Sequence, residues 1–297
     1  DVGAFGGASE QWLRIGRCVH LHGFEANAQE ARRLQDLPTK LAGMHLHPVV
    51  VAERTGPVRF YLTKSPTCSS TLEPNNREFE KYGLPGSLRA TRGQVQSVQQ
   101  LDGISLDDFC RQEQLQPDFV KLDTQGSELS ILRDGFCDHL PGCLGLEVEV
   151  EFVELYKGQP LFSEVELFLR QCGFELFGLK RNLWKMNDGR DCALLHGGRV
   201  TWADALFFHR RMLEPGLPAD VAVKAALLCH RFCLYDVLAR VIAVQQLDPA
   251  EIHRLIQQVD RSDRPSLLGR IKRKLGIGRK KHRDRGVLVE FDEEYGF

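Results

Sequence analysis

Short apolar runs alternate with segments of helical periodicity along the first two thirds of the chain. Runs of this length predict strands, and apolar residues repeating every three or four positions predict helices. The predicted strands are Cys18–Phe24, His45–Ala52, Val58–Leu62, Val95–Val98, Asp118–Asp123, Leu144–Phe152, Gly173–Gly178 and Thr201–Phe208. The predicted helices are Glu10–Gly16, Ala28–Leu37, Ser105–Gln114, Ser127–Arg133 and Leu161–Gln171. This alternation indicates an α/β fold with a largely parallel sheet covered on both faces.

Two segments depart from that alternation. Thr63–Arg92 is polar and rich in turn-forming residues, which predicts a long loop. A loop of this length is typical of a lid or substrate loop, although a disordered insertion gives the same pattern. After Glu214 the composition changes to amphipathic helices over Asp220–Val244 and Pro249–Val259. We therefore expect a domain over residues 1–212, a helical appendage over 213–264, and a flexible tail over 265–297.

The tail is the most basic part of the chain, with nine Lys and Arg residues among the sixteen positions of Arg270–Arg285. A solvated tail is the simplest interpretation, and contact with an anionic surface, nucleic acid or an acidic partner is the alternative. The whole chain of 297 residues carries 39 basic and 40 acidic side chains, so its net charge of -1 gives no general attraction to nucleic acid.

Nine cysteines are scattered without a CxxC pair, which is typical of reduced thiols, and we expect a cytoplasmic protein. No apolar run approaches the roughly 18 residues that a membrane span needs. The oligomeric state does not follow from the sequence.

A glycine-rich turn and a later acid give the strongest chemical signal. The chain begins DVGAFGGAS, so the strand before this turn is expected to be truncated, and Glu25 follows the apolar run VHLHGF. Glycines let backbone pass close to a ligand, and an acid after the next strand can accept ribose hydroxyls. The glycine spacing does not follow the strict dinucleotide pattern. The pair predicts a nucleotide-type cofactor site.

Several segments at the right separations resemble the FkbM-type S-adenosylmethionine-dependent methyltransferases. The resemblance covers roughly residues 1–210 and rests on DVGAFGGAS, GFEAN, FVKLDTQGSELSILRDG, LEVE and ADALFF. It implies a Rossmann-like, three-layer αβα domain. Its seven-stranded methyltransferase sheet has six parallel strands and an inserted antiparallel last strand. The chain departs from the pattern at Gln125, where many relatives carry an acid.

The resemblance also implies site residues. Glu25 matches the ribose acid, with Asn27 beside it. The turn is expected to hold the methionine end and the ribose through Asp1, Gly3, Ala4, Gly7 and Ser9. Ala52 and Glu53, after the third strand, are expected to flank the adenine.

Asp123 is the first candidate for orienting or deprotonating the acceptor, with Glu128 and Glu147 behind it. The alternative for Glu128 is that it only stabilises a helix start. Glu147 alternates with Glu149 and Glu151 along one strand, so one of them is expected to face the site while the others meet solvent. Carboxylates alone do not specify a divalent ion, so no metal site is expected.

The resemblance implies a methyltransferase that uses S-adenosyl-L-methionine to methylate a hydroxyl of a sugar, a glycan or a secondary metabolite, so a small-molecule or glycan acceptor is the expected partner. One alternative is a nicotinamide-dependent oxidoreductase on a related sheet. The other is a non-catalytic interaction protein that keeps only the shell of the cofactor pocket.

Overall fold

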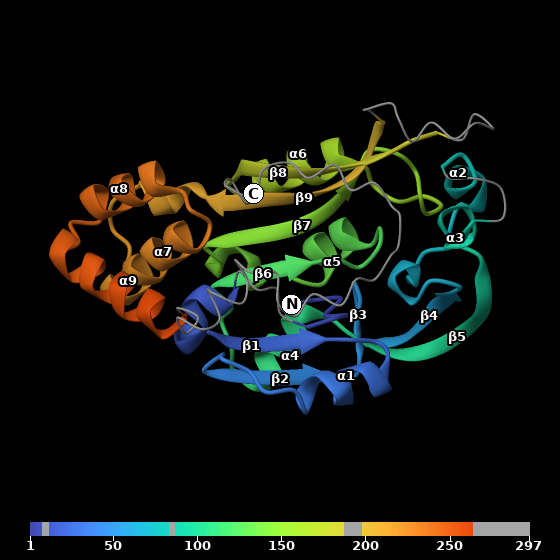
Figure 1. Ribbon diagram of the computed structural model, residues 1–297, viewed down its shortest axis with the longest axis horizontal. Helices are drawn as coiled ribbons and strands as arrows, with labels where there is room; N and C mark the ends of the chain where they lie inside the picture. Colours follow the sequence, from blue (N-terminus) through green and yellow to red (C-terminus); the bar gives the residue numbers. More distant parts are fainter. Residues whose placement is uncertain (8–11, 83–86, 187–197, 264–297) are drawn as a thin grey trace, which may run out of the picture.

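A computed structural model of the chain describes residues 1–7, 12–82, 87–186 and 198–263 (Figure 1). The strands are β1 His20–Phe24, β2 Gly43–His47, β3 Val50–Val51, β4 Gly56–Thr63, β5 Val95–Ile104, β6 Phe119–Leu122, β7 Gly145–Glu151, β8 Phe174–Trp184 and β9 Arg199–His209. The α-helices are α1 Ala28–Gln35, α2 Asn76–Phe79, α3 Leu88–Thr91, α4 Leu106–Glu113, α5 Glu128–Asp134, α6 Phe162–Gln171, α7 Ala219–Arg231, α8 Tyr235–Val244 and α9 Pro249–Asp263. Four 3-10 helices add η1 Trp12–Cys18, η2 Pro66–Cys68, η3 Leu140–Gly142 and η4 Arg210–Leu213.

The described strands form groups of two, three and four rather than the one continuous seven-stranded sheet that was expected. β1 runs parallel to β2, and β6 runs parallel to β7. Val2 joins these pairs through parallel bridges to Phe24 and Leu122, and its N–H donates to the Lys121 carbonyl at 2.8 Å. Val2 thus stands where the truncated first strand was expected. β9 lies between β7 and β8 and is antiparallel to both, as the family resemblance implied.

The third group contains β3, β5 and β4. β4 and β5 form an antiparallel pair. This pairing extends β5 to Ile104, well beyond the predicted strand end at Val98. The predicted strand His45–Ala52 is broken into β2 and β3 around Pro48. Proline has no N–H to donate to a sheet ladder, which accounts for the break.

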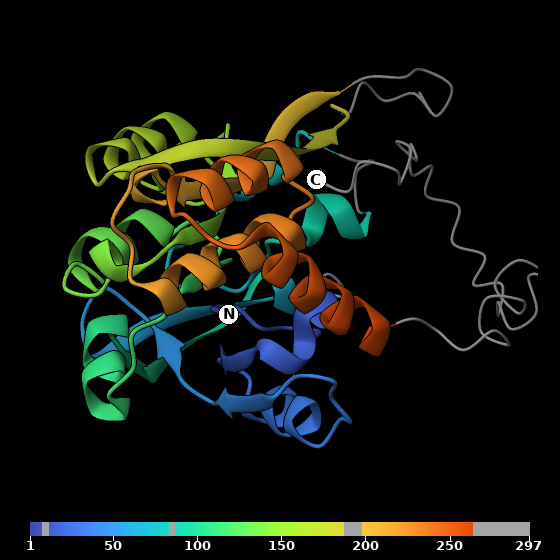
Figure 2. The ribbon, with the colours of Figure 1, turned by 90° about the vertical axis from the view of Figure 1, so that its left-hand side faces the viewer.

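Alternate residues of β9 enter two hydrophobic cores on opposite faces of the strand. Ala203, Ala205 and Phe207 join a core with α4, α5 and α6. Leu206 and Phe208 join a second core with Trp12 of η1 and with the helices α7, α8 and α9. Figure 1 shows these three helices gathered at one end of the molecule, and in Figure 2 they face the viewer. The helices after Glu214 therefore extend the core of the α/β domain.

Thr63–Arg92 contains more structure than the predicted loop. Among its described residues it forms η2, α2 and α3, and Phe79 and Tyr82 are completely or almost completely buried. These rings pack with Tyr156 and Trp184 in a third apolar cluster. The turn-rich composition predicted a loop, but buried aromatic side chains pack this segment against the rest of the chain.

No helix in the described part of the chain combines the length and apolar character required to cross a bilayer.

Candidate functional site

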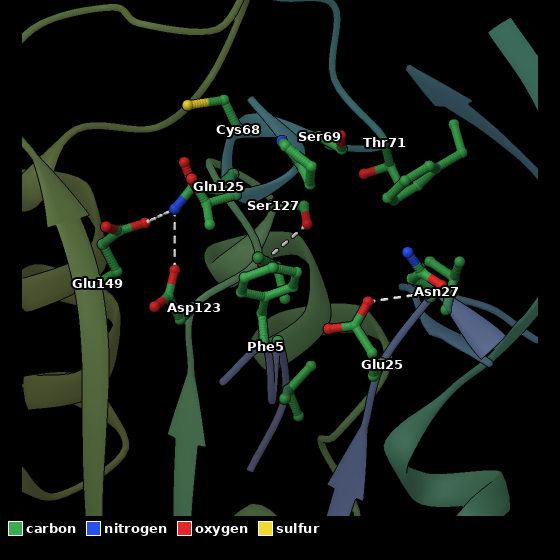
Figure 3. Close-up of a pocket in the computed structure, with 18 of the residues that line it drawn as sticks. Phe5, Glu25, Asn27, Cys68, Ser69, Thr71, Asp123, Gln125, Ser127 and Glu149 are labelled. Carbon is green, nitrogen blue, oxygen red and sulfur yellow. Dashed lines mark hydrogen bonds between the residues drawn. The ribbon is translucent and has the colours of Figure 1, made fainter. Parts of the chain in front are cut away.

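A cavity of about 480 Å³ opens at the carboxyl ends of β1, β6 and β7. Figure 3 shows its lining: Glu25 and Asn27 on one side, and Asp123, Gln125 and Glu149 on the other. Parallel α/β sheets place ligands at this edge, outside the carboxyl ends of their strands. The two sides come from segments roughly a hundred residues apart in the chain.

We call Gly3, Phe5, Glu25 and Asn27 the glycine-turn end of the cavity. Gly3 has a φ of 78°, and a Cβ there would lie 2.0 Å from the Asp123 carbonyl oxygen, so only glycine fits. Gly6 and Gly7 also have positive φ values, of 85° and 88°. The exposed Phe5 ring projects into the cavity between Glu25 and Asp123 (Figure 3).

Glu25 is held at the end of β1 by the turn that starts α1. Its Oε1 accepts the Asn27 N–H at 2.7 Å, while the Asn27 side chain caps α1 through Gln29 and Glu30. Burial raises the pKa of Glu25. Oε2 makes no hydrogen bond to any residue that the structure describes, so this oxygen is available to a ligand.

We call Asp123, Gln125 and Glu149 the carboxylate corner. Leu122 pairs with Val148, so the next residues along the two strands, Asp123 and Glu149, lie level with each other. The Gln125 Nε2 donates to Asp123 Oδ1 at 2.9 Å and also to Glu149 Oε2. One amide group thereby holds two carboxyl groups together.

Gln125 is fixed in place from both its backbone and its side chain. Its φ of 63° is in the left-handed region, which a non-glycine residue adopts only when the surroundings stabilise it. Its Oε1 accepts the Tyr156 hydroxyl at 2.8 Å. Below the turn, the Glu128 carboxylate accepts the N–H groups of Thr124 at 2.6 Å and Gly126 at 2.9 Å.

Glu128 is therefore placed under the turn and not on the cavity wall. Burial raises its pKa to about 7, although its hydrogen bonds oppose that shift. The alternative interpretation, in which Glu128 stabilises the start of a helix, matches these contacts.

Glu147, Glu149 and Glu151 share one face of β7 because side chains alternate along a strand. These glutamates differ in their position along the strand. Glu149 and Glu151, near the carboxyl end of β7, line the cavity, and Glu147 does not. Burial raises the pKa of both lining glutamates, and the nearby Asp123 carboxylate adds to the shift. Glu147 is opposite Lys121 in the β6–β7 register.

We call Cys68, Phe79, Arg92, Trp184 and Trp202 the aromatic wall of the cavity. Cys68 and Phe79 come from the segment after β4, Arg92 follows α3, and the tryptophans come from β8 and β9. Tyr156 connects this wall to the carboxylate corner, since its hydroxyl also lies 3.0 Å from the Cys68 carbonyl oxygen.

Four of the predicted site residues line the cavity: Gly3, Glu25, Asn27 and Asp123. Those that do not are Asp1, Ala4, Gly7, Ala52, Glu53, Glu128 and Glu147. Ser9 lies outside the described residues.

The residues outside the lining have other surroundings. The Asp1 carboxylate is 3.7 Å from Lys121 and faces a second cavity, of about 320 Å³, between β1 and β6. Glu53 forms an ion pair with Arg54 at 3.0 Å. Val49–Val51, just before Ala52, form the wall that Ala52 and Glu53 were expected to form. The bend around Pro48 shifts the strand end relative to the prediction.

Sequence reasoning missed the rest of the carboxylate corner and the whole aromatic wall. Gln125 had a signal, because it occupies a position where relatives carry an acid, and Glu149 had one in its alternation with Glu147. The residues of the aromatic wall had none, because they are distant in sequence and each is an ordinary packing residue by itself.

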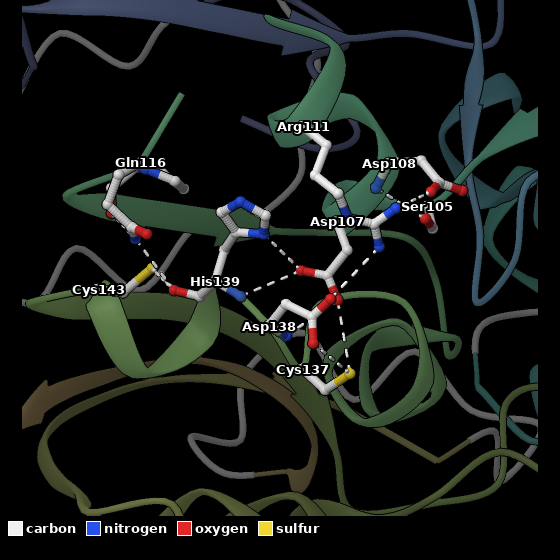
Figure 4. Close-up of polar contacts among 10 residues, drawn as sticks. Ser105, Asp107, Asp108, Arg111, Gln116, Cys137, Asp138, His139 and Cys143 are labelled. Atoms are coloured by element: carbon white, nitrogen blue, oxygen red, sulfur yellow. Dashed lines mark hydrogen bonds and ion pairs between the residues drawn. The ribbon is translucent and has the colours of Figure 1, made fainter. Parts of the chain in front are cut away.

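A separate polar cluster around Asp107 fastens α4 to the segment after α5 (Figure 4). Asp107 accepts the N–H groups of Asp138 at 3.0 Å and His139 at 3.1 Å, and contacts His139 Nδ1 at 2.8 Å. Burial opposes ionisation, but these hydrogen bonds outweigh it and hold the pKa of Asp107 below its usual range. Cys137, Asp138 and Asp107 are close enough to share a metal ion. Since Asp107 already accepts these hydrogen bonds, a structural clamp accounts for the cluster.

Comparison with known families gives one match: a model described as the methyltransferase FkbM domain matches residues 1–176, which is more than half of the chain. No curated protein and no solved structure matches the chain significantly.

Proposed function

Because the chain belongs to the FkbM methyltransferase family, we propose that it uses S-adenosyl-L-methionine to methylate a hydroxyl oxygen. The acceptor class we propose is a sugar, a glycan or a hydroxylated secondary metabolite. One observation carries the proposal: Glu25 and Asp123 face a single cavity from opposite sides of Phe5 (Figure 3).

The cavity has features that suit this cofactor. The missing Cβ of Gly3 lets the turn pack against the Asp123 backbone at the edge of the cavity, and Glu25 Oε2 is available to accept ribose hydroxyls. The lining carries the acids Glu25, Asp123, Glu149 and Glu151 against one basic residue, Arg92. These side chains offer oxygen atoms to a ligand with a positively charged sulfur.

The cofactor would be held at the glycine-turn end, with its ribose on Glu25 and its adenine beside Val49–Val51. When bound, S-adenosyl-L-methionine supplies an activated methyl group on a sulfonium. Phe5, between the two ends, would cover the reacting region and exclude water from it.

Asp123 would orient the acceptor hydroxyl and accept its proton as the new oxygen–methyl bond forms. Gln125 fixes the position of the Asp123 carboxylate, and the Lys121 ammonium lies 3.5 Å from its other oxygen. Most of the rate would come from positioning, because transfer to oxygen requires alignment of the acceptor rather than covalent catalysis by the protein.

The described cysteines are all free thiols. Structural disulfides are rare in reducing compartments, which supports the proposal that the protein works in the cytoplasm. The basic tail lies outside the described residues, so its contact with an anionic surface stays a prediction.

Two measurements test the proposed function. Calorimetric titration should show binding of S-adenosyl-L-methionine and not of NAD. A screen of hydroxylated acceptors should then release S-adenosylhomocysteine. Binding of NAD alone would indicate an oxidoreductase, and binding of neither ligand would indicate a non-catalytic protein that retains the fold.

A further inference from the structure

Arg92 is the one basic residue in the described lining of the cavity. It follows α3 and leads into β5, and its side chain is half-buried on the aromatic wall. A cation in a cavity whose other charged lining residues are all acids needs a specific explanation.

Two contacts hold the Arg92 guanidinium. Its Nε donates to the Cys68 Sγ at 2.8 Å, and its Cζ lies 5.4 Å from the centroid of the Trp184 ring. Stacking on an aromatic face fixes the plane of a guanidinium while leaving its edge accessible. Cys68 and Trp184 thus orient the group without neutralising it.

No carboxylate in the described part of the chain pairs with Arg92, and its two terminal nitrogens make no hydrogen bond there. The four cavity acids have other partners: Asp123 contacts Lys121 and Gln125, Glu149 contacts Gln125, Glu25 accepts from Asn27, and Glu151 hydrogen-bonds to the Gln159 side chain. Partial burial of an unpaired charge is costly, and an incoming anion offsets that cost.

We propose that Arg92 binds an anionic substituent, a carboxylate or a phosphate monoester, on the hydroxylated acceptor. The two terminal nitrogens of a guanidinium match such groups in a bidentate geometry. This inference rests on the proposed function, because it assigns the aromatic wall to the acceptor. The wall adjoins the carboxylate corner through Tyr156, and Figure 3 places Cys68 away from Glu25. An acceptor anchored on Arg92 would therefore have its hydroxyl near Asp123.

The test uses the full chain saturated with S-adenosylhomocysteine, so that no turnover occurs. Calorimetry then compares glucuronate, glucose 6-phosphate and neutral glucose as probes. We expect one or both anionic sugars to bind at least about tenfold more tightly than glucose, the range for a hydrogen-bonded charge pair. Preference for one anionic sugar over the other would identify the substituent as carboxylate or phosphate.

Three variants assign the preference to one side chain. Arg92→Met, which keeps most of the apolar stem, should abolish it, whereas Arg92→Lys should retain part of it. Arg59→Gln is the matched control, because Arg59 is exposed on β4 beside the lining residue Phe60, and it should leave the preference unchanged. Thermal unfolding of each variant shows whether the fold is preserved, and the lysine variant keeps the test valid if the methionine variant unfolds.

The outcomes separate this inference from the proposed function. Failure of S-adenosylhomocysteine to bind the unaltered protein would contradict the proposed function, and titration of the sugars alone would still report any anion preference. Normal binding of S-adenosylhomocysteine without a preference for anionic sugars would overturn the role of Arg92. A preference that survives in Arg92→Met would overturn it as well. A loss of S-adenosylhomocysteine affinity in that variant would also overturn it, because Arg92 would then serve the cofactor.

Discussion

The glycine-turn end and the aromatic wall face the same cavity, but the chain builds them in different ways. Gly3, Glu25 and Asn27 lie in turns that directly follow paired backbone, so local geometry fixes them. The aromatic wall combines residues from a segment after β4 with residues from β8 and β9, roughly a hundred positions later. On the proposed function, local geometry would set cofactor binding and long-range packing would set acceptor binding. Variants at the two ends should therefore have separable effects.

The largest effect is expected at the carboxylate corner. Asp123→Asn should lower turnover by roughly 10²–10⁴-fold, because an amide cannot accept the acceptor proton. Affinity for S-adenosyl-L-methionine should stay within about twofold, the precision we expect of calorimetry. Steady-state kinetics checks the first result. Glu147→Gln, outside the lining, is the control and should be nearly normal. A turnover loss below tenfold in Asp123→Asn would show that Asp123 is not the base.

At Gly3 the glycine turn packs directly against the backbone of Asp123 in the carboxylate corner. Gly3→Ala would bring a Cβ to 2.0 Å from the Asp123 carbonyl oxygen at a φ that disfavours side chains. We expect the free energy of unfolding to fall by about 3 kcal/mol. Gly6→Ala has a similar φ but open space around it, so it should cost only roughly 1 kcal/mol. Urea denaturation compares the two, and equal losses would show that the close approach at Gly3 is not decisive.

The turn under the carboxylate corner should make stability depend on pH. Glu128 holds its proton to about pH 7 in the folded protein but releases it near its ordinary pKa of 4.5 when unfolded. At this group the folded state therefore binds more protons between these values, and the contribution of Glu128 to the free energy of unfolding falls as pH rises through that window. The expected change is on the order of 3 kcal/mol.

Urea denaturation at intervals from pH 4.5 to 8 measures this slope. Glu149 and Glu151 act in the same direction, since burial raises the pKa of each, whereas His22, His47 and His209 act in the opposite direction, since burial lowers the pKa of each. The contribution of Glu128 is therefore the difference in slope between the unaltered protein and Glu128→Gln. An unchanged slope in that variant would show that Glu128 ionises normally in the fold.

The smallest effect tests the glycine-turn end alone. Glu25→Ala should weaken S-adenosyl-L-methionine binding by roughly 30-fold, since hydrogen bonds to a charged group contribute about 1.5–3 kcal/mol. Turnover at saturating cofactor should change little. Glu53→Ala is the control, because Glu53 pairs with Arg54 outside the cavity. Calorimetry that finds Glu25→Ala and Glu53→Ala equally close to normal would exclude Glu25 from the site.

Much of the α/β frame was predictable because its signals are local. The predicted strand at Asp118–Asp123 and helix at Ala28–Leu37 match β6 and α1 to within a few residues. The errors occur where pairing partners are distant. β5 continues past its predicted end because β4 pairs with it, and Thr63–Arg92 folds because buried aromatic side chains pack against β8 and the segment after β7.

Local sequence patterns were enough to predict the family, the glycine turn and the acids that follow the strands, because backbone geometry and strand ends depend on neighbouring residues. The three-dimensional fold then established which acids reach the cavity: Glu149 is level with Asp123 through the β6–β7 register, whereas Glu147 lies farther back along the same face. It also decided that Arg92 faces that cavity against Cys68 and Trp184. Contacts between segments so far apart arise from packing of the whole chain, and no local pattern encodes them.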